Sequence, residues 1–207
     1  MWDGKIGIWP IGHWEAAQRR STTRDAGVPV WRDETVTRDK YRELLLEKVV
    51  PAIAEKWPRR EWNNARFIIW IQQDGAKSHI HPTDMAFAAA MKEKGLDNKI
   101  LLYTQPANSP DTNINDLGFF RALQSMHHGH CPNDEKEIIE YVTQTYDDYN
   151  YNKINYIWLT LMGCYNEIIR CHGDNNYKIP HIGKKALQLR GELPTTLPVT
   201  NEAIEYL

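Results

Sequence analysis

The chain has 207 residues, of which 42% are hydrophobic, and a formal net charge of −2. This length fits one domain with a packed core, and the near-neutral charge excludes a global attraction to nucleic acid or to a membrane surface, so DNA binding would need a local patch. Three cysteines are too few for a disulfide framework and no apolar run reaches the roughly 20 residues of a membrane span, so we expect an intracellular protein without a membrane partner.

The first sixty residues predict a strand, a loop and a helix. Residues 5–9 (KIGIW) alternate between polar and apolar side chains, which predicts a short strand. Residues 11–35 are polar and predict a long loop. Apolar positions at helical spacing follow over residues 37–57, with Thr37 placed to cap the helix and Pro51 expected to kink it.

The middle of the chain alternates strands with helices. Residues 66–72 predict a buried strand, and 99–103 (KILLY) predict another. Between them a helix is expected to begin at Pro82-Thr83-Asp84 and to end at Gly95. Its predicted apolar stripe comprises Met85, Ala88, Ala89 and Met91. A further helix is expected near residues 115–124.

The last third of the chain predicts helices. Residues 135–149 and 154–171 have helical spacing, and a tail punctuated by Gly and Pro follows from Asn175. The order of elements predicts an α/β fold with a parallel element and C-terminal helices. We expect a single domain, with a core over residues 1–132 and a helical part with a tail over 133–207.

Two acidic signatures indicate possible chemistry. The string QQDGAKSH at residues 72–79 places Asp74 at the end of an apolar run, and SPDTNINDLGFF at 109–120 places Asp116 at the start of a helix. Two carboxylates aimed at one place are suited to divalent cations and to phosphoryl transfer on nucleic acid. The alternatives are a turn residue at Asp74 and a helix cap at Asp116.

Together with GKIGIWP at residues 4–10 and GCYNEIIRCHGDNNYKIPH at 163–181, the two signatures resemble the catalytic domain of mariner-like transposases. The DLGFF string at 116–120 is similar to the plant and oomycete type. The resemblance runs in the same order from Gly4 to about Pro194. It implies a ribonuclease H-like fold, and excision and insertion of DNA with two Mg²⁺ (or Mn²⁺) ions.

The resemblance also implies roles for single residues. Asp74 corresponds to the second catalytic Asp of the family and Asp116 to the third, both as metal ligands. The first lies on a strand several tens of residues before GKIGIWP, whereas three residues precede that string here. Asp3 precedes the wrong strand, and Gly75 stands where such transposases usually have Asn. We therefore expect an N-terminally truncated domain that lacks its first strands, binds metal weakly and does not cut DNA alone.

A sheet without its first strand has a stability problem. Each unmet backbone hydrogen bond of a buried strand costs roughly 1–3 kcal/mol. We expect a marginal fold, a rearranged sheet in which residues 5–9 move toward 66–72, or pairing with another chain.

Basic residues near these segments are candidate DNA contacts. They are Lys77 and His79 beside the first signature, and Arg19, Arg20 and Arg24 in the polar segment. The alternative is that they are only solvated. The family implies transposon-end DNA and a second copy or an intact transposase subunit as partners, in the nucleus.

Two other functions remain open. The chain is a non-catalytic remnant that binds DNA or an intact transposase, or it is a structural zinc protein. The string HHGHC at residues 127–131 suggests zinc ligands. Cys164 and Cys171, seven residues apart on a predicted helix, fit core positions better.

Overall fold

The computed structural model describes residues 3–22, 24–57, 62, 67–126 and 134–205. These residues form two compact units. The first unit comprises residues within 3–71, 76–103 and 134–147, and the second comprises residues within 72–75, 104–126 and 148–205. No helix in the described part of the chain is both long and apolar enough to cross a membrane.

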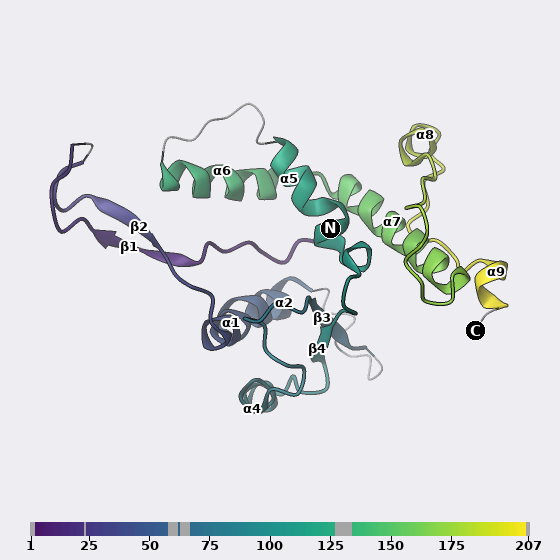
Figure 1. The fold of residues 1–207 in the computed structure, drawn as a ribbon, viewed down its shortest axis with the longest axis horizontal. Helices are drawn as coiled ribbons and strands as arrows, with labels where there is room; N and C mark the ends of the chain where they lie inside the picture. Colours follow the sequence, from purple (N-terminus) through teal and green to yellow (C-terminus); the bar gives the residue numbers. More distant parts are fainter. Residues whose placement is uncertain (1–2, 23, 58–61, 63–66, 127–133, 206–207) are drawn as a thin grey trace. The chain divides into compact units, whose positions relative to one another are not determined.

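An antiparallel hairpin begins the first unit. Strands β1 (Gly12–Ala16) and β2 (Pro29–Asp33) pair with Gly12 opposite Asp33 and Ala16 opposite Pro29 (Figure 1). Trp14 and Trp31 face each other across the strands, with ring centroids 5.4 Å apart in an edge-to-face arrangement. Such cross-strand aromatic pairs stabilise a hairpin.

The hairpin corrects two predictions. The strand predicted at residues 5–9 is wrong, because these residues form no regular structure, and the loop predicted at 11–35 contains both strands instead. Residues 5–9 instead lie against other parts of the first unit. The Lys5 amine donates a hydrogen bond to the Tyr146 carbonyl, near the end of a helix, and Ile6 packs against the hydrophobic core. The expected move of residues 5–9 into a sheet with 66–72 is therefore also wrong.

The predicted helix over residues 37–57 is confirmed as a continuous run. It comprises α1 (Arg38–Leu44), a π-helical turn η1 (Leu45–Val49) and α2 (Val50–Lys56). Thr37 caps it by accepting a hydrogen bond of 3.2 Å from the Lys40 backbone N–H. Instead of a kink described at Pro51 itself, the helix contains a wider π turn just before this residue. The wider turn accommodates the proline ring and the missing backbone N–H.

A second pair of strands is parallel. Strand β3 (Ile69–Gln73) pairs with β4 (Ile100–Thr104). The Ile69 N–H donates to the Lys99 carbonyl at 2.7 Å, and the Gln105 N–H donates to the Gln73 carbonyl at 2.9 Å. Both partners advance in the same direction, so the strands run parallel, as the α/β prediction requires. Strand β3 starts later than predicted and is buried on one face only.

Helix α4 (Met85–Glu93) connects the parallel strands. Asp84 caps it by accepting a bond of 2.8 Å from the Phe87 N–H, and Gly95 ends it with φ +65°, so both predicted ends are confirmed. The predicted apolar stripe is wrong except for Met91. Met85 is 82% exposed, and the buried face is formed by Phe87 and Met91, which lie one turn apart.

The core of the first unit lies between these elements. Its buried members come from the α1–α2 run, from α4 and from both parallel strands. They are Leu45, Val50, Ile53, Ile69, Ile80, Phe87, Met91, Ile100 and Leu102. Helix α6 (Glu135–Asp148) also belongs to this unit and confirms the helix predicted at 135–149.

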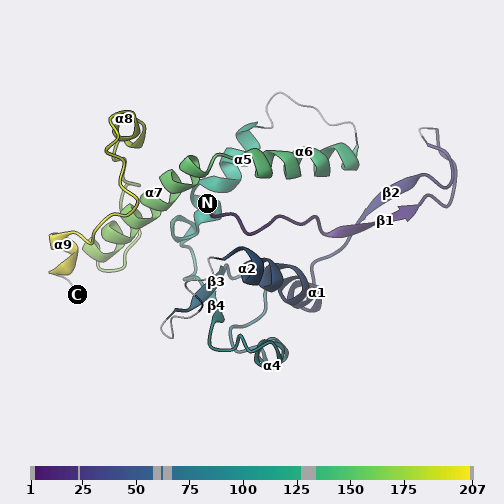
Figure 2. The same ribbon diagram turned by 180° about the vertical axis from the view of Figure 1, so that it is seen from behind.

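The second unit is mainly helical. It contains the short turns η2 (Pro110–Thr112) and η3 (Asn115–Phe119), followed by α5 (Phe120–Met126), and the long helix α7 (Tyr151–Arg170). Helix α7 contacts η2, η3 and α9 (Asn201–Ile204). The prediction of a helix at 154–171 is confirmed, with a start three residues earlier. The tail after Asn175 holds α8 (Lys184–Leu189) as well as α9 (Figure 2).

Candidate metal-binding site

Asp74 belongs to the second unit and directly follows strand β3. It lies where the parallel pair ends, one residue after Gln73, whose carbonyl accepts a hydrogen bond of 2.9 Å from the Gln105 N–H. Its side chain is partly exposed to solvent. The position is therefore the one predicted, at the carboxyl end of a strand, and it leaves room for water around a bound cation.

Asp116 lies in the π-helical turn η3 of the same unit and is exposed. Its Oδ2 accepts a hydrogen bond of 2.8 Å from the Asn113 side-chain amide. Asn113 in turn accepts a bond of 3.1 Å from the Asn115 N–H, which holds the amide in place. Ile114 occupies the cap position of η3, so Asp116 does not cap this turn.

Gln72 joins the two acidic signatures directly. Its side-chain amide donates to the Thr112 carbonyl at 2.9 Å and to the Gln105 side chain at 3.1 Å. Thr112 is buried, and its hydroxyl donates to the Ser109 carbonyl at 2.7 Å. The segment that carries Asp74 is thus bonded to the segment that leads to Asp116, although 40 residues separate the bonded pair.

The donor atoms of Asp74 and Asp116 are of the kind that a hard cation takes. Carboxylate oxygens with solvent access are what Mg²⁺ and Mn²⁺ take, together with several waters. Within the described residues, no group of three or more His, Cys, Asp or Glu side chains is placed to hold a metal ion. Two carboxylates would hold an ion weakly. Their role as metal ligands stays a prediction.

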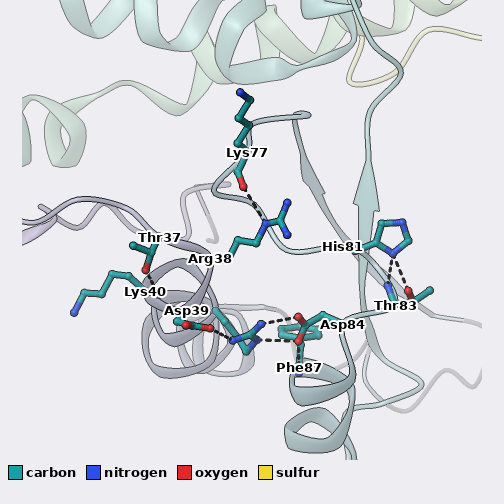
Figure 3. A network of polar contacts seen from close by, with 10 residues as sticks. Thr37, Arg38, Asp39, Lys40, Lys77, His81, Thr83, Asp84 and Phe87 are labelled. Carbon is teal, nitrogen blue, oxygen red and sulfur yellow. Dashed lines mark hydrogen bonds and ion pairs between the residues drawn. The ribbon is translucent and has the colours of Figure 1, made fainter.

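The five predicted DNA contacts belong to the first unit. Lys77 is exposed, and its carbonyl accepts a bond of 3.0 Å from the Arg38 guanidinium (Figure 3). His79 stacks on the Tyr41 ring with centroids 4.3 Å apart. Arg20 pairs with the exposed Asp25 at 3.1 Å. The contact of these side chains with DNA stays a prediction.

Arg19 and Arg24 complete the predicted set of DNA contacts. Both are exposed, and Arg24 lies beside a shallow groove that also involves Trp31 and Glu135. This groove is lined by acids and bases in similar number, so it offers no net positive field to a polyanion. The arginines are therefore placed on the surface, without a shared site.

An ion pair that the sequence did not reveal fixes the start of α4. Arg42 donates two bonds to Asp84, at 2.8 and 2.7 Å, and a third to Asp39 at 2.7 Å. The Arg42 hydrogen bonds lower the pKa of Asp84, and the bond from the Phe87 N–H adds to this effect. The cap at Asp84 was readable from local sequence, whereas a partner 42 residues away was not.

The cysteines do not form a metal site in the described residues. Cys164 is fully buried in α7, which confirms its predicted place in the core, and burial raises the pKa of its thiol to about 11. Cys171 is partly buried at the end of α7. The zinc string at 127–131 lies outside the described residues.

Comparison of the chain with family models, with curated proteins and with solved structures finds no match in any of the three.

Proposed function

We propose that the chain is part of the catalytic domain of a mariner-like DNA transposase with a ribonuclease H-like core, in which Asp74 and Asp116 are two of the metal-binding carboxylates. The observation that supports this proposal best is the Gln72–Thr112 hydrogen bond. It joins the two acidic signatures at the carboxyl end of a parallel strand pair. This bond brings the segment of Asp74 and the segment that leads to Asp116 to the same end of the strand pair, which the proposed metal site requires.

The chemistry follows from the donor set. When bound, two Mg²⁺ or Mn²⁺ ions would activate an attacking water or 3′-hydroxyl and stabilise the leaving oxygen. The role of the chain is to supply oxygen ligands at fixed positions, with Asn113 orienting the Asp116 carboxylate. Cleavage requires a further carboxylate, and no third one joins these two within the described residues. The chain alone is therefore proposed to be inactive on DNA.

The lack of a third carboxylate beside Asp74 and Asp116 within the described residues favours a second candidate function, that of a non-catalytic binding protein. A remnant that binds DNA or an intact transposase subunit needs no complete metal centre. In both cases the partners are transposon-end DNA and another transposase chain, in the nucleus. The two candidates differ in whether Asp74 and Asp116 bind a cation.

Manganese binding tests the site itself. Mn²⁺ titrated into the full chain and followed by electron paramagnetic resonance is expected to show one weak site. Asp74→Asn and Asp116→Asn should each weaken it by about tenfold, since each removes a charged oxygen ligand. Asp97→Asn, an exposed aspartate of the first unit, is the matched control and should change nothing. Unchanged affinity in both site variants would contradict the proposed metal site.

DNA nicking tests the enzyme class. A second polypeptide that carries the family's first strand and its Asp is added in trans, with Mg²⁺ and transposon-end DNA. Nicking is expected with this addition and not with its Asp→Asn version. If Mn²⁺ binds at Asp74 and Asp116 but no addition restores nicking, the non-catalytic remnant is the better description.

A further inference from the structure

The C-terminal part of the second unit carries a local excess of positive charge. Residues 178–190, here called the basic segment, contain four Lys or Arg side chains and no Asp or Glu. The cations are Lys178, Lys184, Lys185 and Arg190. The whole chain has a net charge of −2, so this excess is a local feature and not a consequence of composition.

Most of this charge is not neutralised within the unit. Lys178 and Lys185 are exposed, and neither forms an ion pair with any residue that the structure describes. Two arginines differ: Arg170, which precedes the segment, pairs with Glu167 at 2.5 Å, and Arg190, the last residue of the segment, pairs with Glu192 at 2.7 Å. The free positive charge is therefore concentrated at residues 178–185.

The basic segment is also held in a defined shape. A shallow groove of about 570 Å³ lies between Tyr156 of α7 and residues 181–186. The Lys184 amine donates to the Thr160 hydroxyl and the Tyr156 hydroxyl to Gln188, so two bonds attach the segment to α7. Burial lowers the pKa of Lys184, as expected for an anchoring lysine. The exposed His181 and Lys185 lie on the same groove.

We propose that the basic segment binds the phosphate backbone of duplex DNA, through Lys178, His181 and Lys185. Unpaired ammonium groups on a fixed surface gain affinity for a polyanion by releasing its condensed counterions. The segment belongs to the same compact unit as Asp74 and Asp116, whereas the arginines predicted from the sequence do not. This inference rests on the proposed function, because DNA is the substrate that such a metal centre would take.

Salt-dependent DNA binding tests the surface. The full chain is titrated into a fluorescent duplex and the dissociation constant is measured by anisotropy at several salt concentrations. The double variant Lys178→Gln/Lys185→Gln should bind about tenfold more weakly near 0.1 M salt. The slope of log affinity against log salt should fall by about two, one for each lost phosphate contact.

The matched control removes the same charge elsewhere. Lys92→Gln/Lys94→Gln changes two exposed lysines of the first unit and should keep the slope of the unchanged chain. An equal loss in both variants would show a general charge effect and overturn the proposal. So would an unchanged slope in the Lys178/Lys185 variant, or tighter binding of a polyglutamate peptide than of DNA, which would assign the surface to an acidic protein.

The two proposals can fail separately. If Asp74→Asn weakens Mn²⁺ binding while the Lys178/Lys185 variant binds DNA normally, only the assignment of the basic segment is wrong. The opposite result is also possible. If the Lys178/Lys185 variant shows the expected smaller salt dependence of DNA binding while Asp74→Asn and Asp116→Asn bind Mn²⁺ normally, the basic segment binds DNA and the proposal of a metal site at the two acids is wrong.

Discussion

Replacing Lys5 with methionine is expected to destabilise the first unit by about 2 kcal/mol. The Lys5 side chain is 9% exposed, and its amine donates to the Asp147 carbonyl at 2.6 Å and to the Tyr146 carbonyl at 3.0 Å. Both carbonyls belong to the last turn of α6, where no intrahelical donor reaches them. Methionine fills a similar volume but donates nothing, so both carbonyls would lose a charged partner in a poorly solvated place.

The magnitude comes mainly from the two hydrogen bonds of the amine to helix carbonyls. A hydrogen bond to a charged group contributes roughly 1.5–3 kcal/mol, and two bonds from one amine are less than additive. The third partner, Asp3 at 3.2 Å, is 44% exposed, so this ion pair adds little. Burial of the apolar methionine side chain offsets part of this loss of stability. About 2 kcal/mol corresponds to a melting temperature lowered by roughly 4–8 °C in a chain of this size.

Urea unfolding followed by circular dichroism measures this loss in the full chain. Hydrogen exchange localises it, since the amides of the last turn of α6 should lose protection first. Lys136→Met is the matched control: Lys136 is 64% exposed on the same helix, and its pair with Glu140 at 3.7 Å should contribute below about 0.5 kcal/mol. Equal midpoints for the two variants would refute the assigned role of Lys5.

Three further results are expected. Because Arg42 lowers the pKa of Asp84 below 3.8, that pair stabilises above about pH 4 and its contribution is lost as the pH falls further. Asp84→Asn keeps the helix cap but removes the charge. The urea concentration at the unfolding midpoint should therefore fall less steeply below about pH 4 in this variant than in the unchanged chain. An equally steep fall in both would count against the assigned ion pair. Gly12→Ala would place a Cβ 2.3 Å from the Arg32 carbonyl, so the hairpin amides should lose exchange protection, whereas Gly75→Ala meets nothing within 4 Å and should leave them protected. Met91→Ala removes a side chain that is 1% exposed in the core and should cost about 2–5 kcal/mol in urea unfolding, and a cost below 1 kcal/mol would show a loosely packed core.

Local signals explain which elements could be predicted. Thr37, Asp84 and Gly95 mark helix ends through contacts with residues at most four or five positions away, and the structure confirms all three. The strand at residues 5–9 was predicted wrongly because alternation also arises where an extended segment lies against a core. The hairpin was missed because its strands are short and carry polar residues.

The candidate site was predictable only in part. The two acids stand out because each follows a local pattern, at a strand end and at a helix start. The contact between their segments, from Gln72 to Thr112, depends on the pairing of β3 with β4, and no local pattern encodes it. The sequence analysis did not single out the basic segment, and the bond that anchors Lys184 to Thr160 is a long-range contact that no local pattern encodes.

The π-helical turn that carries Asp116 is a place where the chain could change length by one residue while this side chain keeps its direction. In η3 the Phe120 N–H bonds to the Asn115 carbonyl, so the turn holds one residue more than an α-helical turn. A one-residue deletion within 117–119 would let the same N–H reach the same carbonyl across an α-helical turn. Asp116 would then keep nearly the same direction relative to α5, and the deletion would be absorbed within the turn.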